Sequence, residues 1–215
     1  MKKRLTKLSI VVVLYLLLQY FVPFGRLVLY PVVLFVVYLH EMGHSFFALI
    51  TGGSVHGIQV STDTSGHSLI SGGWWPLVLS GGYIGSALFG NAIMYIALVR
   101  ERWNVYLTIF FIAVLVLTAT FLFQSMESST ILLVFAAAMF VALKAFPGAL
   151  PNINLFIGAA SVCYILQDFM GGPASDLQRF AEHVPAIPVA VWAFLWLGAA
   201  GYITYRNIRY CILRS

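Results

Sequence analysis

Charged side chains are scarce in this chain: Asp, Glu, Lys and Arg make up 9% of its 215 residues, whereas 61% are hydrophobic. A soluble domain normally carries about a quarter charged residues. So few charges cannot cover a water-soluble globule of this length, which excludes that class. The composition instead predicts an all-α polytopic membrane protein whose apolar surface meets lipid.

Cysteine is also scarce, and a signal-peptide cleavage site is missing. The two cysteines, Cys163 and Cys211, lack the spacing of a metal site, which favours two unpaired thiols. The start of the chain imitates a signal peptide, with basic residues before an apolar run. The residues Gln19, Tyr20 and Phe21 do not supply the small side chains that cleavage needs. We therefore expect an uncleaved first membrane helix.

The net charge of +5 does not point to a nucleic-acid partner, because neither a basic stripe nor a nucleic-acid motif accompanies it. The basic residues cluster instead at the two ends of the chain, as Lys2, Lys3, Arg4, Lys7, Arg206, Arg209 and Arg214. Charges that flank membrane spans set topology and meet anionic lipid headgroups. The lipid bilayer is therefore the expected partner of this charge.

Seven apolar runs are long enough, or nearly long enough, to cross a bilayer. They cover approximately residues 8–24, 28–50, 77–99, 105–123, 130–146, 153–169 and 187–205. Because the fifth run is short, six or seven membrane helices are predicted, within a single integral-membrane domain of residues 1–215. Six spans would put both basic ends on the cytoplasmic side, whereas seven would separate them, so the orientation stays open.

The connection after the second run has a different composition, rich in Gly, Ser and Thr. Ile58 and Val60 alternate with polar neighbours, and the sequence Asp63-Thr64-Ser65-Gly66 is typical of a turn. This pattern predicts a short β-hairpin insert over residues 54–72, with a plain flexible loop as the alternative. The segment from Ile58 to Ile70 could bind substrate or serve as a structural plug.

The sequence His40-Glu41-Met42-Gly43-His44 lies within the second apolar run. Positions i and i+4 of a helix share one face, so His40 and His44 can bind one Zn²⁺ ion. Glu41 can then act as the catalytic base toward a water at the metal. Ionisable groups at membrane depth cost about 2.5–3.5 kcal/mol each, and metal binding would compensate this cost. A structural polar cluster, or a metal site without catalysis, is the alternative.

A catalytic zinc site usually has three protein ligands. Asp168 ends the sixth apolar run and is the favoured third ligand, because with seven spans it lies toward the same side as the histidines. Asp176 is the second candidate. Ser175-Asp176 could also cap a short helix, and Asp168 could simply lie in the headgroup zone.

The motif from His40 to His44 within a membrane helix resembles the site-2 protease family of intramembrane zinc metallopeptidases, in particular a bacterial branch of small members. The order of a Gly-rich insert, a small-residue helix and a late aspartate is also similar, over roughly Val28 to Trp196. The resemblance implies two histidines and one aspartate on zinc. Many members place this aspartate before a glycine, whereas Phe169 follows Asp168 here.

The resulting hypothesis is a zinc metalloendopeptidase that cleaves membrane-embedded protein or peptide substrates, in what we expect to be a bacterial cytoplasmic membrane. The alternative is a membrane metal-binding or transport protein without proteolytic activity. Membrane-depth carboxylates are few and no internal repeat is seen, which makes transport the weaker hypothesis.

Overall fold

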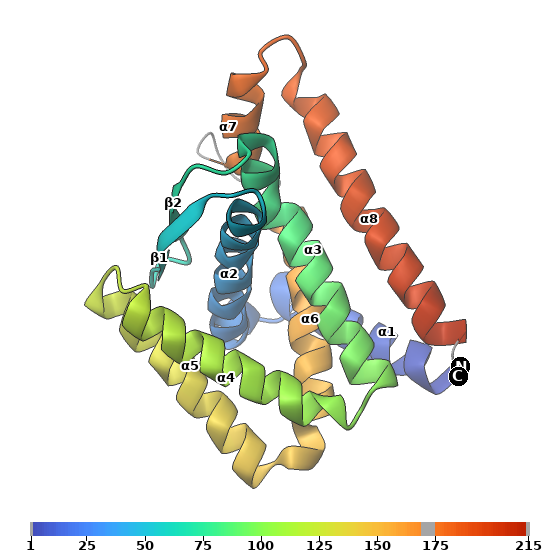
Figure 1. The fold of residues 1–215 in the computed structure, drawn as a ribbon. Helices are drawn as coiled ribbons and strands as arrows, with labels where there is room; N and C mark the ends of the chain where they lie inside the picture. Colours follow the sequence, from blue (N-terminus) through green and yellow to red (C-terminus); the bar gives the residue numbers. More distant parts are fainter. Residues whose placement is uncertain (1, 169–174, 214–215) are drawn as a thin grey trace.

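The computed structural model describes residues 2–168 and 175–213 of the chain (Figure 1). Within them lie eight α-helices, one 3-10 helix and a two-stranded sheet. In chain order these are α1 Lys2–Tyr20, α2 Gly25–Ile50, β1 Ser54–Val60, β2 Gly66–Ser71, α3 Trp75–Val99, α4 Trp103–Phe121, α5 Met126–Ala145, η1 Pro147–Ala149, α6 Leu150–Asp168, α7 Asp176–His183 and α8 Val189–Leu213. The mostly helical architecture and the hairpin after the second helix confirm these two parts of the predicted fold class.

Five helical segments of the described chain are long and apolar enough to cross a membrane: α2, α3, α4, α5 and the stretch Pro147–Leu166 that includes most of α6. The other two predicted spans correspond to α1 and α8. Basic residues occupy the first two turns of α1, and Arg206 and Arg209 precede the last turn of α8; these charges lower the apolar character of both helices. Five candidate spans make the chain an integral membrane protein, and the count of six or seven remains a prediction.

Helices α2, α3 and α6 form the centre of the molecule (Figure 1). The antiparallel pair α4 and α5 lies along one flank, and α8 lies along α3 on another. Large side chains such as Phe110, Phe121 and Phe194 are exposed on these outer helices. An apolar exterior of this kind is suited to lipid rather than to water.

The beginning of the chain and its last helix meet at one end of the molecule (Figure 1). The guanidinium of Arg4 in α1 donates a hydrogen bond from Nη1 to the Cys211 carbonyl oxygen in α8, at 3.0 Å. Both basic ends of the chain therefore lie on the same side, as the six-span alternative requires.

The hairpin is ordered, so the alternative of a plain loop is wrong. Its strands pair antiparallel from Ser54–Ser71 to Val60–Gly66, and Thr64 closes the turn with a positive φ of 67°. Ile58 and Val60 are buried, as their alternation predicts. The outer edge of β1 is covered by the start of α5, where the Val60 N–H donates to Ser128 Oγ at 3.0 Å. Because β2 pairs only with β1 in the described chain, its other edge has no strand partner.

Two glycines allow the backbones of the central helices α3 and α6 to touch. A Cβ atom on Gly158 of α6 would lie 2.7 Å from the Gly90 carbonyl oxygen of α3, and a Cβ on Gly90 would lie 2.9 Å from the Gly158 carbonyl oxygen. Small residues allow such close packing in lipid, where helix association depends on van der Waals contact.

We predict that Gly158→Ala lowers the thermal stability of the detergent-purified protein. Overpacking costs about 1–3 kcal/mol, which exceeds the gain of up to about 1 kcal/mol that alanine brings in a helix interior. Gly198→Ala is the matched control, because no atom lies within 4 Å of the added Cβ there. Equal unfolding temperatures for the two variants would contradict the close α3–α6 contact.

Candidate metal centre

Helix α2 presents two imidazoles to the interior of the helix bundle. His40 and His44 are one turn apart, with ring centroids separated by 4.9 Å. Their side chains are only 12% and 9% exposed. Tyr83 of α3 contacts the His40 ring edge-on, with centroids 5.2 Å apart, and restricts its rotation. The sequence spacing thus gives a pair of neighbouring, largely buried nitrogen ligands.

The short helix α7 brings a carboxylate to the same point. Ser175 caps α7 by accepting a hydrogen bond from the Gln178 N–H, and so fixes Asp176 as the first helical residue. The Asp176 Oδ2 atom lies 2.8 Å from His40 Nε2 and 2.9 Å from His44 Nε2. Asp176 therefore adjoins the helix cap, as its sequence suggests, and also reaches both imidazoles.

These three side chains fit the donor set of a zinc site. Their possible ligand atoms all lie within 4.8 Å of one another. Tetrahedral zinc with ligands at 2.0–2.2 Å places the ligand atoms about 3.3–3.5 Å apart, so Asp176 Oδ2 and the imidazoles would need to separate by roughly half an ångström. Two nitrogens and one carboxylate oxygen also match the His₂–carboxylate chemistry of catalytic zinc sites.

The protonation states of the group suit metal binding. The Val78 carbonyl oxygen lies 2.7 Å from His44 Nδ1 and accepts its hydrogen, so Nε2 is the ring nitrogen that faces Asp176 and would bind a metal in place of its own hydrogen. Burial would raise the pKa of the Asp176 carboxyl, but hydrogen bonds from His40 and His44 outweigh that effect and hold the pKa below its usual range. The carboxylate is therefore ionised, as a ligand must be.

Gly82 of α3 lies directly beside the two imidazoles. A Cβ atom at this position would lie 2.2 Å from His40 Nε2 and 2.6 Å from His44 Nε2. Any side chain here would occupy the space where the two nitrogens converge. The neighbouring glycines have a different role, because Gly43 and Gly85 bring the backbones of α2 and α3 together.

The hairpin holds the glutamate of the motif. Ser68 of β2 donates its hydroxyl to Glu41 Oε2, at 2.6 Å, and approaches the Glu41 carbonyl oxygen at 3.0 Å. A Cβ on Gly66 would lie 2.6 Å from Glu41 Oε1, so the hairpin packs closely on this carboxylate. Glu41, His44 and Asp176 line one cavity of about 140 Å³. Glu41 thus shares a small space with the candidate ligands.

The described residues bring together His40, His44 and Asp176, with Glu41 beside them. Asp168 ends α6, but its side chain lies outside the described part of the structure, so its predicted role as a ligand stays untested. The remaining histidines are not in the described group, and His56 instead contacts Ser71 Oγ at 3.0 Å.

Three groups that shape the candidate metal centre were not identified from the sequence: Gly82, Ser68 and the Val78 carbonyl group. The small-residue run in α3 contains Gly82, and close packing is the usual role of such glycines in membrane helices. That role holds at Gly81, where a Cβ would meet the Gly43 carbonyl oxygen at 3.0 Å, but not at Gly82. Ser68 and Val78 act through contacts between segments that no local pattern reports.

These features define a class, that of helical membrane proteins in which two histidines of an H-E-x-x-H helix meet an aspartate from another helix, the kind of site on which metallopeptidases depend. The chain belongs to the Peptidase M50B-like family, whose sequence profile matches residues 8–206. This family is related to the site-2 proteases, so the resemblance seen in the sequence is confirmed, and membership implies a metallopeptidase. Neither the curated proteins nor the solved structures include a significant match to the chain.

We predict that Gly82→Ala abolishes or strongly weakens metal binding, because the methyl group would meet both Nε2 atoms. Metal content after purification, measured by mass spectrometry, checks this expectation. Gly198→Ala serves again as the control, since its Cβ enters open space. A Gly82→Ala protein that retained a full complement of metal would show that the imidazoles converge elsewhere.

Proposed function

We propose that this protein is a zinc metalloendopeptidase that hydrolyses peptide bonds of membrane-embedded substrates. In this proposal His40, His44 and Asp176 hold the metal, and Glu41 is the general base. The observation that carries the proposal is the convergence of one carboxylate oxygen on two imidazole nitrogens, at 2.8 and 2.9 Å, beside the buried Glu41. Membership of the Peptidase M50B-like family supports the reaction class.

The mechanism assigns a separate task to each side chain. A bound zinc ion would acidify a water molecule and polarise the scissile carbonyl group. Glu41 takes the proton of the attacking water and later passes it to the leaving nitrogen. Ser68 is a positioning residue, because its hydroxyl holds Glu41 Oε2 at 2.6 Å. The His44–Val78 hydrogen bond fixes the ring orientation and the tautomer.

The choice of Asp176 as third ligand replaces Asp168 as the favoured residue. Asp176 is supported by direct contact with both histidines and by a helix cap that fixes its position. Its neighbours Leu177 and Phe180 are buried, and Phe180 packs against Trp196 with ring centroids 5.1 Å apart. A carboxylate held by buried aromatic packing is well suited to a fixed ligand role.

The hairpin suggests how substrate is held. A peptide bond can reach the metal only in an extended segment, and such a segment can add to the edge of a sheet. β2 has an edge without a strand partner in the described chain, and Ser68 of this strand contacts Glu41. We infer that an unwound stretch of a membrane substrate pairs with β2 next to the general base.

The metal ligands are tested by the zinc content of detergent-purified protein. We expect about one zinc per chain in the wild type, and loss of zinc in His44→Ala and Asp176→Ala. Asp168→Ala should keep its zinc, and so should His56→Ala, an exposed histidine outside the group. Loss of zinc in Asp168→Ala together with retention in Asp176→Ala would assign the third ligand to Asp168 instead.

The catalytic role is tested by Glu41→Gln. This variant should keep its zinc but lose activity by a factor of about 10²–10⁴, because the amide cannot accept the proton of water. Turnover can be followed on casein in detergent and on a single-span membrane peptide in lipid nanodiscs. Glu182→Gln is the matched control, since that carboxylate is exposed on α7.

The same pair of variants separates proteolysis from transport. A metal transporter would retain its function in Glu41→Gln wherever the side chain only spaces the ligands. Full peptidase activity in Glu41→Gln, or a wild type that holds zinc without cleaving either probe, would count against the proposed reaction.

A further inference from the structure

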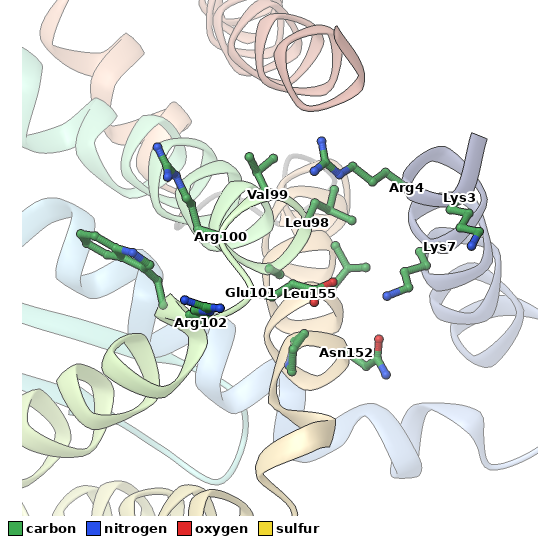
Figure 2. A pocket seen from close by; sticks show the side chains of 13 residues that line it. Lys3, Arg4, Lys7, Leu98, Val99, Arg100, Glu101, Arg102, Asn152 and Leu155 are labelled. Atoms are coloured by element: carbon green, nitrogen blue, oxygen red, sulfur yellow. The ribbon is translucent and has the colours of Figure 1, made fainter. Parts of the chain in front are cut away.

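A second pocket lies at the opposite end of α3 from the metal centre. Its volume is about 700 Å³, and it is formed by the first turns of α1, the α3–α4 connection and the start of α6 (Figure 2). Gly82, beside the metal ligands, and Arg100, at this pocket, are 18 positions apart in sequence. That distance corresponds to about 27 Å at a helical rise of 1.5 Å per residue. The pocket is thus separate from the proposed active site.

The pocket has a strong excess of positive charge. Five cations line it, and Glu101 is the one carboxylate among its lining residues. The cations are Lys3, Arg4, Lys7, Arg100 and Arg102. Figure 2 shows Arg4 and Lys7 extending from α1 across the pocket toward α3 and α6. Among the described residues, no ion pair involves Glu101 or the cations Lys3, Lys7, Arg100 and Arg102.

Like charges gathered in this way repel one another, and an anion in the pocket would relieve the repulsion. The fixed arrangement also favours an anion, because the Arg4–Cys211 hydrogen bond ties α1 to α8 beside the pocket. A group with several negatively charged oxygens, such as a phosphate, matches a set of lysine and arginine side chains.

The remaining walls of the pocket distinguish a lipid from a free anion. Leu98, Val99 and Leu155 supply apolar surface, and Trp103 stands at the first turn of α4. The pocket therefore lies where three candidate membrane spans begin or end, at the level where tryptophan marks the membrane interface. Basic pockets between membrane helices at this level bind anionic headgroups.

We propose that this pocket binds the phosphate-bearing headgroup of an anionic phospholipid. The cations contact the phosphate oxygens, and the acyl chains follow the apolar walls into the bilayer. Each cation near an anionic membrane surface is worth about 1 kcal/mol, so the loss of one should weaken lipid binding by about fivefold.

The test is native mass spectrometry of the full-length protein in detergent, titrated with phosphatidylglycerol or phosphatidylcholine. We expect the wild type to retain phosphatidylglycerol in preference, and Lys7→Gln and Arg102→Gln each to bind it about fivefold more weakly. Lys144→Gln is the matched control, because Lys144 lies in the last turn of α5 and does not line the pocket. Its affinity should equal that of the wild type.

Three outcomes would overturn the proposal. One is equal retention of the two lipids by the wild type. Another is an equal loss of affinity in Lys144→Gln, which would indicate a general effect of surface charge. The third is displacement of phosphatidylglycerol by inorganic phosphate at equal concentration, which would identify the ligand as a free anion. Thermal unfolding and zinc content confirm that each variant is folded, so failure here is distinguishable from failure of the proposed peptidase function.

Discussion

The structure depends on partners for the ionisable side chains that lie among its membrane helices. Four ionisable side chains are largely shielded from solvent, namely His40, His44, Glu41 and Asp176. In such a buried environment an unpaired polar or charged group costs several kcal/mol. The imidazoles and the aspartate compensate one another by converging on a common point, and Ser68 supplies a donor to the glutamate. The same convergence that limits the desolvation cost creates a set of ligands for a divalent cation. The same arrangement of side chains therefore serves both the stability of the fold and the proposed metal binding.

The packing of α2 on α3 explains a residue of the motif that has no chemical role of its own. Gly43 stands between His40 and His44 in sequence, and a Cβ there would lie 2.3 Å from the Gly81 carbonyl oxygen. Its lack of a side chain lets α3 approach, and this approach brings the gap at Gly82 next to both imidazoles. On the far side, Gly66 allows the hairpin the same close approach to Glu41. Glycines on three segments thus set the dimensions of the site.

The sequence predicted the features that depend on local pattern. Helix positions, the hairpin and the H-E-x-x-H helix follow from periodicity, turn residues and spacing, and the structure reproduces them. The choice between Asp168 and Asp176 does not follow in this way, because it depends on where α7 lies relative to α2. Asp176 directly follows the capping residue Ser175, so its place in the sequence suggests a role in the helix cap alone. In the structure its carboxylate also contacts His40. The number of spans is equally hard to read, since α1 and α8 combine apolar runs with basic turns.

Charge is distributed unevenly along the molecule, and the distance between its two polar regions limits how they can interact. The cations of the basic pocket lie near one end of α3, whereas Asp176 and Glu41 lie near its other end. The separation of about 27 Å along α3 exceeds the Debye length of about 8 Å at physiological salt, so the solvent-exposed charges are largely screened from the metal centre. A bound headgroup would instead act on the candidate metal centre through helix packing, since α3 contributes Gly82 to one site and Leu98 to the other. A headgroup that joins α1, α3 and α6 would stabilise the helix on which the imidazoles pack.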